Sequence, residues 1–321
     1  MKRFLLVCLL ATPFSLAFAD EDTADDPWLV LQKAAHAARE LSYKGIFTYQ
    51  SLGSTKSVEI THMNSSQGEY ARIVVLDGSP REVLSQGTDA VIFNTRDGKV
   101  VIEKHRGKSM FPALLPVNMD AIKLSYLVRL GGQERVGGRT GQIVFLDPRD
   151  RFRYSYKFWA DREYGLLLKL LASNERNEVV EQIAFNQLQL LDTQNMDWFQ
   201  PDVDNKKPYV MEESTPVASS VVENGWTLAE LPAGYRKIDQ MKCKVSGKKT
   251  PATHIIFSDG LASVSLFIEP LTKGVRPKTG HTAAGATNFY ANVTNGYQIM
   301  VVGEVPEGTV AQIANAVSFK K

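Results

Sequence analysis

Strict alternation between aromatic and polar side chains from Phe152 to Phe158 constrains the fold more than any other feature of this chain. The aromatic positions are Phe152, Tyr154, Tyr156 and Phe158, and the positions beside and between them are Arg151, Arg153, Ser155 and Lys157. Because successive side chains on a β-strand point to opposite faces, this segment predicts a strand with one aromatic face and one basic face. That division is typical of an antiparallel sheet with one buried and one solvated side.

Similar short runs, separated by turn residues, fill most of the chain up to Leu190. We expect strands at residues 44–51, 57–63, 69–77, 81–85, 90–94, 99–105, 142–146, 151–160, 165–173 and 179–190. Helices are few: one begins at Pro27, capped by Asp25 or Asp26, and a shorter one spans about Asn118 to Arg129. The pattern predicts a mainly β (α+β) fold, in which a large curved antiparallel sheet or unclosed barrel has its concave side covered by helices.

The chain is expected to divide after residue 200. The stretch Pro201–Gly225 has three prolines, scattered acids and little patterned apolar content, so it reads as an interdomain linker. A smaller α+β domain follows, with strands at residues 235–239, 253–258, 262–268, 288–293 and 297–304 and a closing helix at 306–317. Lys273–Ala286 reads as a mobile loop. The expected domains are therefore residues 20–200 and 226–321, joined by a linker at 201–225.

Residues 1–19 read as a secretory signal peptide. Lys2 and Arg3 precede the apolar core Phe4–Leu16, and Ala17-Phe18-Ala19 is a cleavage site of the A-x-A type. The whole chain carries a formal charge of +2, and removal of Lys2 and Arg3 leaves it neutral, which argues against nucleic acid as a partner. No other apolar run is long enough to cross a membrane. Only Cys243 remains after cleavage, so no intramolecular disulfide can form.

The sequence offers no motif for catalysis, for a metal or for a cofactor. The five histidines stand in neither an H-E-x-x-H pattern nor a close Cys/His cluster, and no G-x-S-x-G, P-loop or G-x-G-x-x-G motif occurs. Asp259-Gly260, close to His254, is explained by a hairpin turn without any chemistry. We therefore expect a binding protein rather than an enzyme.

Two interpretations of the aromatic face remain open. It can be ordinary core beneath a helix, or it can be the wall of an apolar cavity in a sheet too wide to be filled by side chains, with room for acyl chains. Phe47 and Tyr49 alternate in the same way and can face the same space, so the candidate ligand-binding residues are Phe47, Tyr49, Tyr154, Tyr156 and Phe158. The basic face of Arg151, Arg153 and Lys157 is either solvated or a contact for phosphates or an acidic partner.

Six longer motifs, spread over both expected domains, resemble a known family. They are Leu76–Val83, Glu134–Arg139, Arg153–Tyr156, Trp226–Tyr235, Ser258–Pro270 and Val302–Pro306. Together they are similar to the periplasmic sigma-E factor regulatory proteins, the RseB/MucB family, over nearly the whole mature chain. The chain departs from the family pattern at Gly137-Gly138 and at Cys243.

The resemblance implies an N-terminal domain like the lipoprotein carriers LolA and LolB, together with a smaller C-terminal α+β domain. It further implies a periplasmic protein that binds the periplasmic segment of a membrane-spanning anti-sigma factor and shields it from the first cleaving protease. Lipopolysaccharide or misplaced lipoprotein lipid is expected to release it, and no catalytic residues are expected. For the partner contact we expect cationic residues, namely Arg151, Arg153, Lys273, Arg276 and Lys278.

Two other functions compete with regulation. A periplasmic lipid or lipoprotein carrier would need only the first domain, so the second domain discriminates against it. An exported hydrolase is disfavoured by the missing motifs. The sequence leaves self-association of the protein open.

Overall fold

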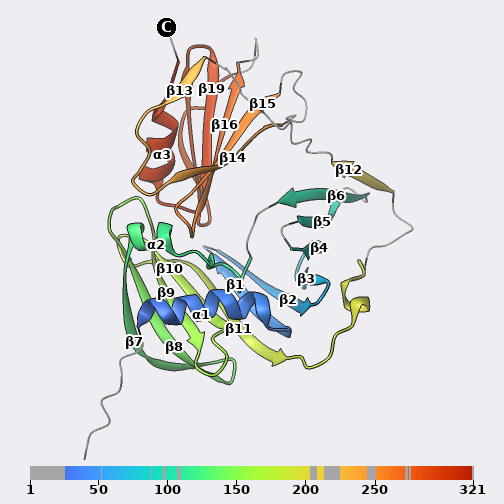
Figure 1. Ribbon diagram of the computed structural model, residues 1–321. Coiled ribbons are helices and arrows are strands. Elements are labelled where there is room, and N and C mark those ends of the chain that lie inside the picture. Colours follow the sequence, from blue (N-terminus) through green and yellow to red (C-terminus); the bar gives the residue numbers. More distant parts are fainter. Residues whose placement is uncertain are drawn as a thin grey trace, which may run out of the picture.

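The computed structural model describes residues 26–51, 53–87, 89–96, 99–106, 110–202, 208–212, 225–243, 251–271, 274 and 276–319. The expected signal peptide at residues 1–19 lies outside these ranges. Two β-sheets form the bulk of the described chain, and the smaller C-terminal sheet stands at one end of the larger N-terminal sheet (Figure 1). Within these ranges, no helix combines the length and the hydropathy that crossing a membrane requires.

The larger sheet is curved and does not close. Its order is β12-β6-β5-β4-β3-β2-β1-β11-β10-β9-β8-β7, so β12 and β7 are its free edges. The strands are β1 (Tyr43–Ser51), β2 (Ser54–Ser65), β3 (Gly68–Val75), β4 (Arg81–Gln86), β5 (Asp89–Arg96), β6 (Lys99–Arg106), β7 (Tyr126–Val136), β8 (Arg139–Pro148), β9 (Ser155–Asp161), β10 (Leu167–Ser173), β11 (Val179–Leu190) and β12 (Tyr209–Glu212). All neighbours pair antiparallel except β12 and β6. The predicted fold class, mainly β with an unclosed curved sheet, is confirmed.

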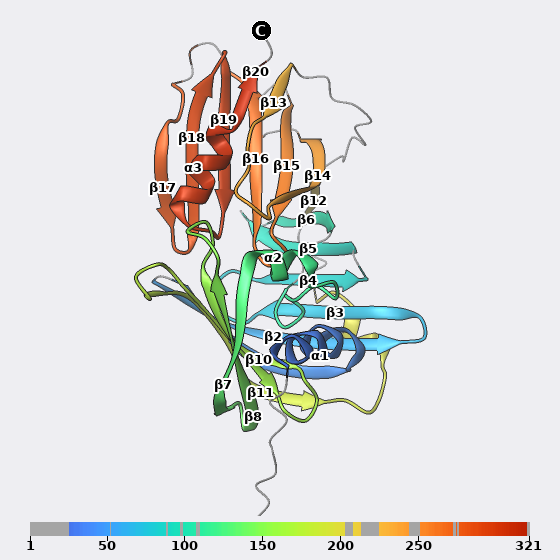
Figure 2. The ribbon, with the colours of Figure 1, turned by 60° about the vertical axis from the view of Figure 1, so that its left-hand side comes forward.

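Helix α1 (Pro27–Glu40) lies across the inner face of this sheet (Figure 2). As predicted, Pro27 opens the helix, and Asp26 caps it by accepting a hydrogen bond from the Trp28 amide at 2.9 Å. Its buried face consists of Leu31, Ala34, Ala35, Ala37 and Ala38. The helix contacts β2 as well as β7, β8 and β9. These strands are too far apart in the strand order for one helix to reach them all on a flat sheet, so the sheet bends around the helix.

The predicted helix from Asn118 to Arg129 is too long. Helix α2 spans only Asp120–Ser125, and β7 begins at Tyr126. The cause is the alternation of Tyr126, Val128 and Leu130, which pair along β8 and face the core. Gly131 lies within β7, where an added Cβ would be 2.6 Å from the Phe145 ring.

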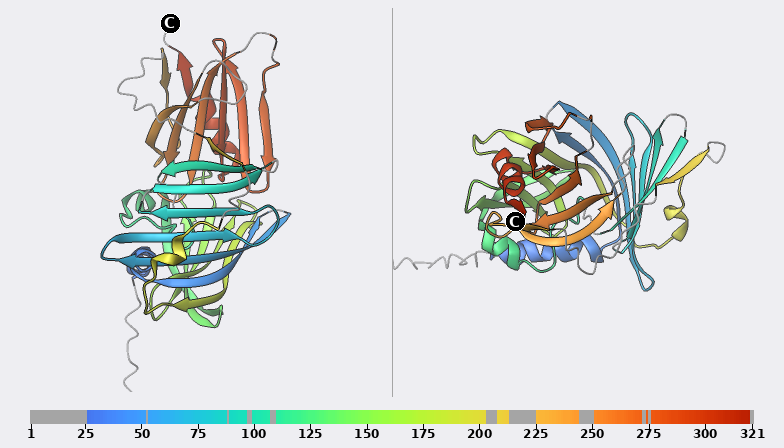
Figure 3. Two further views of the ribbon diagram at one scale, coloured as in Figure 1. Left: turned by 90° about the vertical axis from the view of Figure 1, so that its right-hand side faces the viewer. Right: turned by 90° about the horizontal axis from the view of Figure 1, so that it is seen from above.

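The C-terminal domain is a six-stranded antiparallel sheet with one helix against it. The strand order is β14-β15-β16-β19-β18-β17, and β13 pairs separately with β20. The elements are β13 (Trp226–Leu228), β14 (Arg236–Cys243), β15 (Ala252–Ser258), β16 (Ser263–Pro270), β17 (Gly280–Ala284), β18 (Thr287–Thr294), β19 (Tyr297–Gly303), α3 (Glu307–Asn315) and β20 (Val317–Phe319). Figure 3 shows this sheet from the side and from above, standing over the end of the larger sheet. Val310, Ile313 and Ala314 of α3 complete a core separate from that of the N-terminal domain.

Two segments that the sequence analysis left without regular structure contain strands. Within Pro201–Gly225, β12 pairs in parallel with β6, with Tyr209 opposite Val100. Within Lys273–Ala286, β17 pairs with β18, with Gly280 opposite Ala291. Cys243 ends β14, and its side chain lies outside the described part of the chain.

Candidate functional site at the aromatic wall and the domain junction

The five residues predicted to bind a ligand, called the aromatic wall here, all belong to the core of the N-terminal domain. Phe47, Tyr154 and Phe158 are buried in it, and Tyr49 and Tyr156 pack against it. Strand alternation places Phe47 and Tyr49 on the inner face of β1, and Tyr156 and Phe158 on that of β9. All five residues therefore belong to, or pack against, one apolar core.

Ring contacts divide the aromatic wall into two groups. The Phe47 ring meets the rings of Phe111 and Phe185 edge-on, with centroids 5.1 and 5.8 Å away. The Tyr156 ring lies parallel to that of Phe158, with centroids 5.8 Å apart, and meets Tyr126 at 6.0 Å. Strands β11 and β10 separate the two groups.

The tyrosine hydroxyls of the wall stay protonated over the physiological range. Burial, followed by the nearby carboxylates of Glu181 and Glu304, raises the pKa of Tyr49 to about 12. Burial also raises the pKa of Tyr154 to about 12 and that of Tyr156 well above its ordinary value. These groups therefore act as neutral hydrogen-bonding partners.

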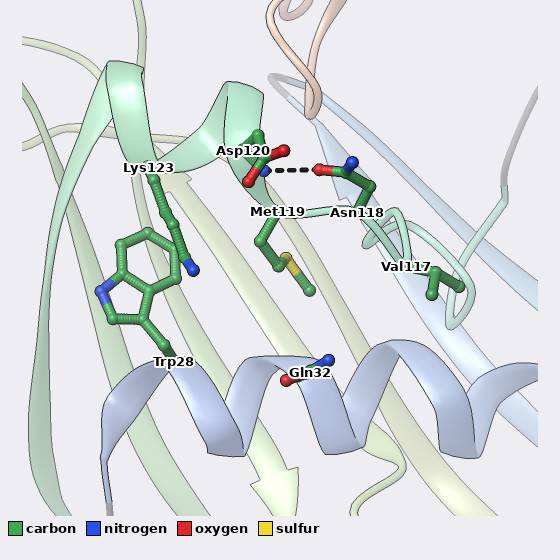
Figure 4. A pocket seen from close by; sticks show the side chains of 7 residues that line it. All are labelled: Trp28, Gln32, Val117, Asn118, Met119, Asp120 and Lys123. Carbon is green, nitrogen blue, oxygen red and sulfur yellow. Dashed lines mark hydrogen bonds between the residues drawn. The ribbon is translucent and has the colours of Figure 1, made fainter.

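A pocket of about 290 Å³ opens between α1 and the segment that leads into α2 (Figure 4). It is lined by Trp28, Gln32, Val117, Asn118, Met119, Asp120 and Lys123. Lys123 Nζ lies 5.5 Å from the centre of the Trp28 ring, and Asn118 Oδ1 accepts a hydrogen bond from the Asp120 amide at 2.8 Å. A second pocket, of about 320 Å³, lies at the start of α1 against β8 and β9. Neither pocket is lined by a residue of the aromatic wall, so the cavity expected there stays a prediction.

Arg153 is not part of an exposed basic face, contrary to the sequence prediction. Its side chain is only 1% exposed, because β9 begins at Ser155 and the preceding residues turn beneath the C-terminal domain. The guanidinium forms ion pairs with Asp150 and with the fully buried Asp259, whose Oδ2 lies 2.9 Å from Arg153 Nε. It also donates to the Ala233 carbonyl and stacks over Tyr235 at 5.0 Å. Burial alone would lower the pKa of Arg153, but Asp150 and Asp259 together raise it.

Arg153 is the centre of a junction that joins the two domains through the segment Asp150–Tyr154. The Phe152 carbonyl accepts hydrogen bonds from Thr309 Oγ1 at 2.8 Å and from the Tyr235 hydroxyl at 3.3 Å. Asn288 Nδ2 donates to the Tyr154 hydroxyl at 3.2 Å. Tyr154 therefore belongs both to the aromatic wall and to the contact with the C-terminal domain.

Gly234 shows how closely the domains approach. Its φ of +82° favours glycine, and an added Cβ would lie 2.5 Å from Ser125 Oγ and 2.9 Å from Arg153 Nη2. A side chain at this position would push the junction apart.

The other predicted partner-binding cations are dispersed. Arg151 is exposed on the N-terminal domain, and Arg276 and Lys278 are exposed in the segment before β17. The Lys278 amide donates to Gln298 Oε1 at 2.8 Å, which holds this segment against β19. Lys273 lies outside the described residues. Arg276 and Lys278 thus lie in one exposed segment of the C-terminal domain, whereas Arg151 lies on the N-terminal domain.

Asp259 is a residue of the domain junction whose contact with Arg153 the sequence analysis missed. Its predicted role as a turn residue is confirmed, since Oδ1 accepts from the amides of Leu261 and Ala262 at 3.0 and 2.9 Å. Its other oxygen, Oδ2, meets Arg153 and the Tyr126 hydroxyl in the N-terminal domain. A single sequence carries no signal that pairs a turn in one domain with a pre-strand arginine in the other. Within the described ranges, no group of three or more His, Cys, Asp and Glu residues is placed to hold a metal ion.

Two family models match this chain. That of the MucB/RseB N-terminal domain matches residues 26–203, and that of the MucB/RseB C-terminal domain matches residues 220–318. The sigma factor AlgU regulatory protein MucB of Pseudomonas aeruginosa is 30% identical over 98% of this chain and 96% of its own length. The sigma-E factor regulatory protein RseB of Escherichia coli is 24% identical over 99% of both chains.

Solved structures resemble the fold over the same extent. A crystal structure of MucB in complex with MucA(peri) aligns with a TM-score of 0.72 at 27% identity, covering 92% of this chain and 100% of that chain. A crystal structure of MucB aligns with a TM-score of 0.66 at the same identity, covering 93% of this chain and 99% of that chain.

Proposed function

The chain belongs to the MucB/RseB family, and from this premise we propose that it regulates an envelope-stress sigma factor by binding the periplasmic segment of a membrane anti-sigma factor. The family assignment drawn from the six motifs is confirmed, because both family models match. The observation that carries the proposal is the likeness to MucB as found in its complex with MucA(peri), which covers 92% of this chain. Both domains fall within that likeness.

The proposal places the mature protein in the periplasm. The signal peptide expected at residues 1–19 supports this location, as does the crystal structure of MucB in complex with MucA(peri). The role is that of a binding protein and not of an enzyme, as the names of the curated relatives also suggest.

We further propose that the bound protein shields the anti-sigma segment from its first protease and that a lipid releases it. The aromatic wall is the candidate acyl site, because four of its side chains lie on the inner face of the sheet and the fifth, Tyr154, is buried in the same core. Tyr154 links that wall to Asn288 in the C-terminal domain, so displacement of the wall by a lipid would disturb the domain junction. Each buried methylene contributes roughly 0.8 kcal/mol, so even a short acyl chain would compensate for several lost contacts.

Recovery of bound proteins from an envelope extract tests the proposed identity of the partner. The mature protein, immobilised, is expected to retain a single-pass anti-sigma factor. A matched column carrying only the N-terminal domain controls for the lipid-carrier alternative, because a carrier needs only that domain. Retention of diverse lipoproteins on both columns, without an anti-sigma factor, would favour the carrier and contradict the regulatory proposal.

A further inference from the structure

Strand β17 is a free sheet edge without the features that usually protect one. It is the last strand of the C-terminal sheet, pairs only with β18, and all five of its residues are exposed. Figure 2 shows it at the outer side of that domain. Natural proteins protect free edges with charged side chains, prolines, bulges or very short strands, because an open edge pairs readily with another chain.

The other three edges of the two large sheets carry such protection. Strand β14 has four charged residues and a register shift between Lys237 and Asp239. Strand β7 has three charged residues and a register shift between Leu130 and Gln133. Strand β12 has only four residues. The sequence of β17, Gly-His-Thr-Ala-Ala, contains no lysine, arginine, carboxylate or proline, and its register with β18 is regular.

The hydrogen-bonding pattern leaves two residues of β17 pointing outward. Ala284 and Thr287 flank the two-residue turn at Gly285-Ala286 and form a hydrogen-bonded pair in a hairpin of this length. Since bonded and non-bonded pairs alternate along an antiparallel ladder, the backbone groups of Ala283 and His281 face away from β18. Their N–H and C=O groups are free to bind a further strand.

Two anchors hold this edge in place. The His281 ring nitrogen Nε2 lies 2.7 Å from Asn288 Oδ1 on the neighbouring strand. At the hairpin tip, the Ala286 amide donates to Ser51 Oγ of β1 at 3.2 Å, and Ala286 is buried in the N-terminal core. An edge already fixed in the bound conformation loses little conformational entropy when it binds a strand.

We propose that β17 binds an extended acidic segment of the anti-sigma partner as an additional antiparallel or parallel strand of the C-terminal sheet. This inference rests on the proposed function. Charge supports the choice of occupant, because Arg276 and Lys278 are exposed directly before β17 and form no ion pair within the described part of the chain. In such strand addition, main-chain hydrogen bonds give affinity, while flanking charges select the partner.

Proline substitution at an outward-facing position tests the proposal. Ala283→Pro removes one outward N–H but no ladder bond to β18, a position at which edge strands accept proline. Ala283→Ser keeps the N–H and serves as the matched control. With the purified periplasmic segment of the anti-sigma factor as the probe, calorimetry is expected to show about tenfold weaker binding for Ala283→Pro and unchanged binding for Ala283→Ser.

Hydrogen exchange gives a second readout that needs no variant. In the wild-type complex, the amides of His281 and Ala283 are expected to exchange more slowly than in the free protein. Equal affinity of all three proteins, or unchanged exchange at these two amides, overturns the edge proposal and leaves the proposed function standing. Failure of the wild-type protein to bind the segment overturns both, and protection of β17 by self-association alone overturns the edge proposal.

Discussion

Among single residues, Arg153 departs most clearly from the prediction made from the sequence. Alternation assigned it to an exposed basic face together with Arg151 and Lys157, whereas its guanidinium is buried between Asp150 and Asp259. Alternation along the sequence predicts which face of a sheet a side chain occupies only within a strand. Arg153 lies before β9, which begins at Ser155. Tyr156 and Phe158 of the same pattern do face one core, because they lie inside the strand.

Loss of Arg153 is expected to destabilise the protein, because Asp259 would be left as a buried charge without its main partner. We expect Arg153→Met to lower the free energy of unfolding by about 3 kcal/mol in urea denaturation. Arg151→Met is the control and is expected to cost less than about 1 kcal/mol, since Arg151 is exposed. Similar losses for the two variants would contradict the buried ion pair as described.

At the scale of elements, the sequence predicted the strands of the N-terminal sheet and the start of α1 well, because alternation and capping are local signals. It failed where local signals conflict. Residues 126–130 read Tyr-Leu-Val-Arg-Leu, whose apolar positions suit either a short helix or a strand, and pairing with β8 decides for the strand. Strand β12 has only four residues and follows Pro208. It is a strand because it pairs with β6, and no local sequence pattern reveals that pairing.

Helix α1 offers a test of the core with a control in the same helix. Leu31 is fully buried, whereas Leu29 is 61% exposed. We expect Leu31→Ala to lower the free energy of unfolding by about 2–5 kcal/mol and Leu29→Ala to change it by less than about 0.5 kcal/mol. Thermal and urea denaturation of both variants measure this difference, and a larger loss for Leu29→Ala would show that the helix packs through another face.

The segment before β17 gives a prediction about association rate. Replacement of Lys273, Arg276 and Lys278 by Ala is expected to slow association with the anti-sigma segment and to weaken its dependence on salt, with folding unaffected. Stopped-flow binding at several ionic strengths measures both quantities. Replacement of Lys56, Arg81 and Arg176, three exposed cations of the N-terminal domain, removes the same charge and is the control. Equal slowing by the two triple variants would attribute the effect to net charge rather than to this segment.

At the scale of the whole molecule, the sequence predicted two domains but not how they meet. The junction consists of single contacts between distant residues, such as Thr309 with the Phe152 carbonyl and Asn288 with Tyr154. No local sequence pattern marks any of these four residues as a contact between the domains. The junction bears on the proposed function, because it lies between the proposed lipid site in one domain and the proposed strand-binding edge in the other.

Limited proteolysis tests the proposed domain boundary. We expect two stable fragments from cleavage within Pro201–Gly225, on the C-terminal side of β12, whose backbone is hydrogen-bonded to β6. Mass spectrometry of the early fragments locates the cut. First cuts inside Gln142–Leu190 would contradict the boundary, because these residues form the four paired strands β8 to β11 of the larger sheet.

Protection of the anti-sigma segment from its protease tests the central claim most directly. The purified periplasmic segment of the anti-sigma factor is incubated with the protease that cleaves it first, with and without the mature protein, and the rate of cleavage is measured. The mature protein is expected to slow cleavage in proportion to the bound fraction, and added lipopolysaccharide or lipoprotein lipid is expected to restore the rate. Cleavage at the same rate with and without saturating protein would contradict this claim.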